Sequence, residues 1–250
     1  HRDLHSFPTR RSSDLGSLQG KILGLVFFDP SLRTRVSFET AMLRHGGHAL
    51  CLEPGKGVWA FETRPGAVMD GAAAEHLVEA ARVLGRYVDA LGVRSFPVGT
   101  DLEAAFADPV VRTFAAEAGV PVINLESARR HPCQGLGDAL TLQEKLGVCS
   151  GRRFVLAWAW HPRPLPTAVP VSAAIAAARL GMEVVLAHPP GFDLHPGDMA
   201  AIRAVAERNG ASVARSSDLD QALAGADVVY AKSWGSLERF GDPEGEALLR

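Results

Sequence analysis

The stretch LVFFDPSLRTRVSFE, residues 25–39, decides the fold of its surroundings. Its first four residues are apolar and rich in Val and Phe, which is typical of a short buried strand. Asp29 and Pro30 end this strand, and Ser31 is a candidate N-cap for the helix that follows. We expect that helix to be largely buried through its apolar residues, which are Val36, Phe38, Met42 and Leu43. Gly46-Gly47 is predicted to end it.

The polar residues of this stretch form a candidate anion site. A helix N-terminus carries unpaired N–H groups and the positive end of the macrodipole. Ser31 and Thr34 add hydroxyl groups, while Arg33 and Arg35 add guanidinium groups shaped for phosphate. The alternative is a capped helix with a solvated basic first turn. Because basic residues oppose the dipole there unless an anion is bound, we favour the anion site.

The composition favours an α/β protein of two domains. The chain has 250 residues, of which 47% are hydrophobic, and its formal net charge is −2. That charge does not indicate a nucleic-acid or membrane partner, and no apolar run approaches the roughly 18 residues of a membrane-spanning helix. The cysteines, Cys51, Cys133 and Cys149, are too scattered for a disulfide framework or a zinc site. We therefore expect free thiols in a reducing cytoplasm.

Strand and helix patterns alternate from Gly20 onward, which predicts parallel sheets with right-handed crossovers. Residues 1–15 show neither period and lack the apolar core of a signal peptide, so we expect a disordered or foreign lead-in. Glycines near residues 147–151 interrupt the pattern. We therefore predict two domains, residues 16–147 and 148–250, each a parallel sheet flanked by helices.

The predicted elements follow from apolar periodicity. Strands are expected at 22–28, 48–52, 90–96, 120–124, 153–160, 183–187, 212–214 and 227–231. Helices are expected at 34–45, 73–85, 110–118, 137–146, 171–180, 197–209 and 219–223. A long loop at 53–71 carries Trp59 and Phe61, which argues against plain disorder. Such an aromatic residue either anchors local packing or reaches a ligand or a partner subunit.

Other polar residues lie at or just beyond the ends of predicted strands. These residues are Arg94, Glu126, the segment 131–134 with sequence HPCQ, and Lys232. Arg94 alone could be a surface arginine, and a His-Pro turn is often only structural. Because the carboxyl ends of parallel strands share one edge, however, these groups are expected to converge there. They predict a site that acts on a phosphorylated substrate by positioning and electrostatics.

A dinucleotide site is not expected. The first strand–helix turn of the second domain, WHPRPLP at residues 160–166, has no glycine, so the backbone cannot approach a pyrophosphate closely. A phosphate-binding Walker loop, metal-ligand spacing and a Ser-His-Asp order are equally absent from the sequence.

Two motifs carry a family resemblance. FFDPSLRTR at 27–35 resembles the carbamoyl-phosphate signature of the aspartate and ornithine carbamoyltransferases, and HPCQ at 131–134 resembles their second signature. Further segments are similar to the N-acylornithine branch of this family, namely PGKGVW at 54–59, VMDG at 68–71, RVLGRYVD at 82–89, VINLE at 122–126 and ADVVYAKSWG at 226–235.

The resemblance implies a fold of two α/β domains and a reaction. The carbamoyl group of carbamoyl phosphate would pass to the δ-amine of N-acetyl-L-ornithine, giving N-acetyl-L-citrulline and phosphate in arginine biosynthesis. It implies a cytoplasmic homotrimer that needs no metal or organic cofactor. The alternatives are the same reaction on N-succinylornithine or ornithine, or a non-catalytic phosphate-binding assembly subunit.

The resemblance also implies roles for residues of the first domain. The phosphate of carbamoyl phosphate would be held by Ser31, Leu32, Arg33 and Thr34, with Leu32 acting through its backbone. Trp59 would reach carbamoyl phosphate in the site of a neighbouring subunit.

The remaining roles concern the carbamoyl group and the acceptor. Arg94, His131 and Gln134 would hold and polarise the carbamoyl group, and with Arg33 they form the expected catalytic set. Glu126 and Lys232 would bind the acylornithine.

Two departures from the family pattern stand out. Ala74 occupies the position at which the acetylornithine enzymes carry a Glu and the succinylornithine enzymes carry Pro. The sequence therefore leaves open which acyl group the acceptor ornithine carries. The family's first helix, its later His-Cys-Leu-Pro segment and its C-terminal helix do not occur between His1 and Arg250. We therefore expect this chain by itself to be poorly active or inactive.

Overall fold

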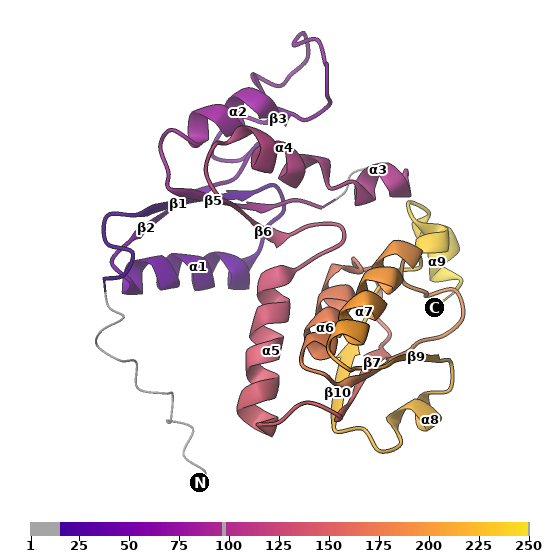
Figure 1. Ribbon diagram of the computed structural model, residues 1–250. Coiled ribbons are helices and arrows are strands. Elements are labelled where there is room, and N and C mark those ends of the chain that lie inside the picture. The colour runs from indigo at the N-terminus through magenta and orange to yellow at the C-terminus, as the bar shows by residue number, and fades with distance from the viewer. Residues whose placement is uncertain (1–15, 97–98, 250) are drawn as a thin grey trace. The chain divides into compact units, whose positions relative to one another are not determined.

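The computed structural model describes residues 16–96 and 99–249, which form two compact units (Figure 1). Of the described residues, 16–95 and 110–123 belong to the first unit, and 96, 99–109 and 124–249 belong to the second. The predicted lead-in at 1–15 lies outside the described residues. Each unit contains a parallel sheet flanked by helices, so the predicted fold class is confirmed. Among the described residues, no helix is both long and apolar enough to cross a membrane.

The first sheet has the strand order β2-β1-β5-β6. Its strands are β1 (Ile22–Phe27), β2 (His48–Leu52), β5 (Ala90–Arg94) and β6 (Val122–Glu126). β1 runs parallel to both neighbours, β2 and β5, and its last residue, Phe27, pairs with Arg94. The carboxyl ends of β1 and β5 therefore meet at one edge.

Helices lie on both faces of the first sheet (Figure 1): α2 (Leu77–Leu84) and α4 (Pro109–Glu117) on one, α1 (Leu32–Arg44) on the other. The core under α2 and α4 includes Val26, Leu91 and Phe114, all fully buried. This is how a parallel sheet, apolar on both faces, is shielded from water.

Helix α1 is far more exposed than its sequence suggested. Within it only Thr34 and Met42 are buried, while Val36 is 50% and Leu43 75% exposed. The expectation of a largely buried helix is wrong, because one narrow stripe of α1 rests on the sheet and its apolar residues extend beyond that stripe. The predicted stop is correct: Gly46 follows the last turn with φ of 81°, a conformation that favours glycine.

The second sheet has the order β10-β7-β8-β9, with every neighbouring pair parallel. Its strands are β7 (Arg153–Trp158), β8 (Glu183–Ala187), β9 (Val213–Ser216) and β10 (Val228–Lys232). α6 (Ala168–Arg179) and α7 (Pro196–Arg208) cover one face, and α8 (Leu219–Leu223) covers the other (Figure 1). Side chains alternate accordingly: Phe154 and Leu156 join the cluster with α6 and α7, whereas Val155 and Ala157 join the one with α8.

Several elements differ from the sequence prediction. α5 (Pro132–Leu146) begins five residues earlier than expected, and α2 begins later. A two-residue parallel pair, β3 (Phe61–Glu62) and β4 (Glu75–His76), forms where a loop and the start of a helix were predicted. Three short helices were not predicted, because they have too few residues to show a period: α3 (Leu102–Phe106), η2 (Leu237–Arg239) and α9 (Pro243–Ala247).

Candidate functional site

The N-terminus of α1 has the geometry of a capped anion site. Ser31 is extended, with φ of −154° and ψ of 119°, and its hydroxyl accepts the Thr34 N–H at 3.3 Å. The first turn contains no acidic residue. Leu32 is 79% exposed, so the backbone of this turn is accessible. The predicted group Ser31, Leu32, Arg33 and Thr34 therefore lies on one turn of helix.

The two arginines of this turn differ in their partners. Arg35 is neutralised by Glu39 at 3.0 Å and Glu53 at 2.7 Å. Arg33 has no ion-pair partner anywhere in residues 16–96 and 99–249. Its charge adds to the positive end of the macrodipole, which makes the turn attractive to an anion.

Arg94 lies beside this turn. It is the last residue of β5, is 9% exposed, and its carbonyl accepts the Phe28 N–H at 3.0 Å. Phe28 follows β1 directly and leads the chain toward Ser31. The register of two strands therefore brings Arg94 to the sheet edge at which α1 begins, as the sequence predicted for this residue.

Trp59 extends from the loop between β2 and β3. Its side chain is 59% exposed, and its indole N–H donates to Glu75 Oε2 at 2.8 Å. A large aromatic residue this exposed is not a packing anchor of the first unit.

A second group of predicted residues gathers in the second unit. Glu126 ends β6 and is 7% exposed, and its Oε2 lies 3.3 Å from His131 Nε2. Lys232 ends β10. Burial lowers the pKa of Lys232, and the negative charge of Glu126 acts in the opposite direction. A carboxylate, an imidazole and a partly desolvated amine thus lie close together.

The HPCQ segment is placed differently from the sequence prediction. It was expected in a turn before a helix starting at 137, but α5 begins at Pro132, with His131 as its N-cap. A proline at the first helical position has no N–H group that would need a partner, so Pro132 is a sequence signal that could have located the start of this helix. His131 N–H donates to Ser172 Oγ at 2.8 Å, and Gln134 Nε2 donates to Asp138 Oδ1 at 2.8 Å. Gln134 therefore lies in the first turn of a helix.

Cys133 lies between these two residues and is a partly buried free cysteine. Burial raises the pKa of its thiol, which keeps the sulfur protonated and weakly reactive. Within the described part of the chain, no cluster of three or more His, Cys, Asp or Glu could hold a metal ion.

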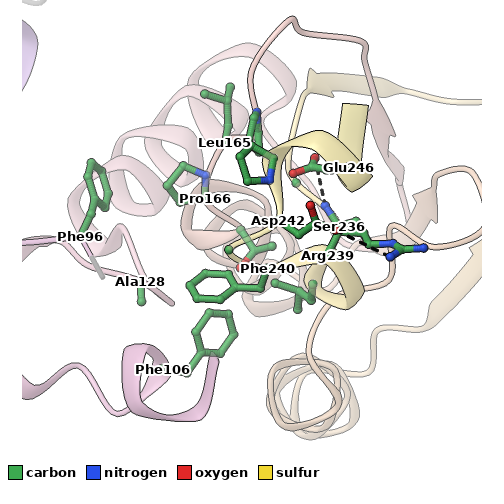
Figure 2. A pocket seen from close by; sticks show the side chains of 16 residues that line it. Phe96, Phe106, Ala128, Leu165, Pro166, Ser236, Arg239, Phe240, Asp242 and Glu246 are labelled. Atoms are coloured by element: carbon green, nitrogen blue, oxygen red, sulfur yellow. Dashed lines mark hydrogen bonds and ion pairs between the residues drawn. The ribbon is translucent and has the colours of Figure 1, made fainter. Parts of the chain in front are cut away.

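The second unit also contains a cavity of about 310 Å³ that the sequence did not predict (Figure 2). Its walls are mainly apolar, and the rings of Phe106 and Phe240 meet edge to face with centroids 6.4 Å apart. Two buried hydroxyl groups at the wall, Thr167 Oγ1 and Ser236 Oγ, have no hydrogen-bond partner in the residues described. The predicted site residues do not line this cavity. It was missed because its lining comes from short segments scattered along the sequence.

Phosphate-shaped donors at the carboxyl end of β1 define a candidate binding site for a phosphorylated ligand, and comparison with known proteins specifies the family. Residues 3–144 match the carbamoyl-phosphate-binding domain of the aspartate/ornithine carbamoyltransferases, and residues 165–248 match their aspartate/ornithine-binding domain. The chain belongs to the aspartate/ornithine carbamoyltransferase family, as its motifs predicted.

Individual relatives narrow the comparison. The N-acetylornithine carbamoyltransferase of Xanthomonas campestris pv. campestris is 50% identical over 245 residues, which cover 96% of this chain and 72% of that protein. The N-succinylornithine carbamoyltransferase of Bacteroides fragilis is 37% identical over 230 residues, covering 92% and 68%. A crystal structure of acetylornithine transcarbamylase complexed with acetylcitrulline matches with a TM-score of 0.92 at 48% identity, covering 96% of this chain and 72% of that chain.

Proposed function

We propose that the protein transfers the carbamoyl group of carbamoyl phosphate to the δ-amine of N-acetyl-L-ornithine, giving N-acetyl-L-citrulline and phosphate. The observation that carries this proposal is the N-terminus of α1, where the uncompensated Arg33 joins a capped first turn. The likeness to N-acetylornithine carbamoyltransferases supports the choice of acceptor. The reaction is a step of arginine biosynthesis and takes place in the cytoplasm.

The phosphate is held by the first turn of α1. Ser31 and Thr34 donate from their hydroxyl groups, Leu32 from its exposed backbone, and Arg33 supplies the charge-assisted contact. In this proposal residues 16–147 form the carbamoyl-phosphate-binding domain and residues 148–250 form the acylornithine-binding domain.

Polarisation of the carbamoyl group is the catalytic step that the residues must supply. Negative charge grows on the carbonyl oxygen as the amine attacks, and donors aimed at that oxygen lower the barrier. Arg94, His131 and Gln134 are the donors in this proposal. Each lies at a strand end or a helix N-terminus, where backbone geometry fixes its position.

The acceptor is bound by Glu126 and Lys232. The partly buried ammonium of Lys232 suits the α-carboxylate of an amino acid, because desolvation strengthens such a contact. The neutral δ-amine attacks the carbonyl carbon and the carbon–nitrogen bond forms. The bond between that carbon and the phosphate oxygen breaks, and the departing phosphate takes up the proton that the amine loses.

A second acceptor is favoured by one residue. Ala74 stands where the acetylornithine enzymes carry Glu, so a longer, negatively charged acyl group meets no carboxylate there. Structures of N-acetyl-L-ornithine transcarbamylase variants with one Glu replaced by Ala, Pro, Ser or Val are complexed with carbamyl phosphate and N-succinyl-L-norvaline. N-succinylornithine is therefore the second candidate substrate.

The assembly in this proposal is a homotrimer. The exposed indole of Trp59 reaches the carbamoyl phosphate bound in a neighbouring subunit, which accounts for a bulky aromatic residue on a long polar loop. Sedimentation velocity of the complete protein tests the assembly, and a purely monomeric species at micromolar concentration would overturn it.

Calorimetric titration with carbamoyl phosphate tests the function itself. We expect saturable binding of one carbamoyl phosphate per chain to the complete protein, followed by turnover when N-acetylornithine is added. Binding without turnover on any acylornithine would leave a phosphate-binding assembly subunit, and no binding would reject the α1 site.

A further inference from the structure

The segment between β6 and α5 is unusually well anchored. Its turn is closed by the Ser127 N–H, which donates to Arg130 O at 2.9 Å. Asp108 accepts the Ala128 N–H at 3.1 Å and the Ser127 hydroxyl at 3.0 Å. Asp108 has φ of 50°, an uncommon conformation for a non-glycine residue. This segment delivers His131, so its rigidity bears on the site.

A buried carboxylate on α7 anchors the other side of the same segment. Asp198 is fully buried, and its Oδ1 accepts from Arg129 Nε at 3.0 Å and Nη2 at 2.6 Å. The same oxygen accepts from Arg130 Nη1 at 2.5 Å. Arg130 Nη1 also donates to the carbonyl of Arg129 at 2.9 Å, which ties the guanidinium back to the turn. Two consecutive arginines are thus fixed by one carboxylate.

These contacts lie directly beside the pair formed by Glu126 and His131. Arg130 directly precedes His131, and the His131 N–H itself donates to Ser172 Oγ. The imidazole then lies 3.3 Å from Glu126. These contacts hold the backbone from which the imidazole extends toward that carboxylate.

We propose that Asp198 is a positioning residue for His131, acting through Arg129 and Arg130. This inference rests on the proposed function, because it assigns the anchored imidazole a part in carbamoyl transfer. Asp198 serves to keep the imidazole within the narrow range of positions that the transition state requires, since a displacement of about 1 Å at a reacting group can cost about 100-fold in rate.

Asp198→Asn removes the charge that both guanidinium groups share while keeping the size of the side chain. We expect kcat to fall by about 100-fold, with the KM for carbamoyl phosphate changed by less than about threefold. Asp227→Asn is the matched control. Asp227 also accepts from an arginine, Arg152 at 3.0 Å, and from the Arg153 N–H at 2.7 Å, but it precedes β10 at the opposite edge of the sheet. The control should keep its kcat.

The readout independent of activity is the nuclear magnetic resonance signal of the His131 imidazole, assigned by its loss in His131→Gln. We expect Asp198→Asn to shift and broaden this signal, and Asp227→Asn to leave it in place. An unchanged signal together with an unchanged kcat in folded Asp198→Asn would overturn the proposal. If Asp198→Asn does not fold, Arg130→Lys keeps the charge but shortens the reach, and the same two outcomes decide. A shifted signal in a protein without carbamoyl transfer would reject the proposed function and leave the anchoring intact.

Discussion

Replacing Arg33 with Ala is the perturbation that separates binding from stability most cleanly. Arg33 lies in the first turn of α1 and has no ion-pair partner within the described residues, so its removal breaks no internal contact. Its guanidinium opposes the helix macrodipole in the absence of a ligand and contacts phosphate in its presence. One substitution should therefore weaken binding and strengthen the fold.

The magnitudes follow from the two interactions. A charge-assisted hydrogen bond to an anion contributes about 1.5–3 kcal/mol, which corresponds to a rise of about 10- to 150-fold in the Kd for carbamoyl phosphate. Removing a cation from a helix N-terminus stabilises it by about 0.5 kcal/mol. The free energy of unfolding of the free protein should rise by that amount.

The assay pairs calorimetric titration of carbamoyl phosphate with urea unfolding of the free protein. Arg44→Ala is the control, because Arg44 is an exposed arginine in the last turn of the same helix. There the cation complements the dipole, so its loss should destabilise slightly and leave the Kd unchanged. Equal Kd values for Arg33→Ala and the wild type would refute the assignment of this helix N-terminus as the phosphate site.

Three further predictions concern specificity, charge and packing. Ala74→Glu should shift the ratio of kcat/KM for N-acetylornithine over N-succinylornithine upward by at least about tenfold, measured by product formation; an unchanged ratio would contradict the role given to this position. Lys232→Met should raise the KM for the acceptor. Because burial lowers the folded-state pKa of Lys232 below its ordinary 10.5, the wild type gains stability as the pH rises from the folded-state pKa to 10.5. The variant's advantage in melting temperature over the wild type should therefore shrink toward pH 10.5, and a difference that does not change with pH would contradict this reasoning. Gly85→Ala should destabilise the protein by about 3 kcal/mol, because the added Cβ would lie 1.8 Å from the carbonyl oxygen of Ala118. Gly137→Ala, in a helix and with no atom within 4 Å of the added Cβ, should stabilise the protein by about 0.5–1 kcal/mol. Similar unfolding midpoints for the two variants would refute both expectations.

Local signals made much of the fold predictable. The strand over Glu183–Ala187 and the helix over Leu219–Leu223 have the bounds that periodicity predicted. The capped helix start at Ser31 was also predictable, because a strand, a proline and an N-cap follow one another within a few residues. Each of these features depends on residues close together in the chain.

Features that depend on distant contacts were not predictable in this way. The exposure of Val36 and Leu43 depends on how narrow a stripe of α1 the sheet covers. The anchoring of Arg129 and Arg130 by Asp198 joins residues nearly seventy positions apart. The cavity around Phe240 is likewise lined by residues that lie far apart in the sequence. Apolar periodicity along a single chain contains no information on such pairings.

The central claim is that the protein carbamoylates an N-acylated ornithine. The most direct measurement is the initial rate of the complete protein with carbamoyl phosphate and either N-acetylornithine, N-succinylornithine or ornithine, followed by separation of the citrulline-type products. We predict that an N-acylornithine is carbamoylated with a kcat/KM at least about 100-fold above that for ornithine. Carbamoylation of ornithine alone, or of none of the three while carbamoyl phosphate still binds, would contradict the account.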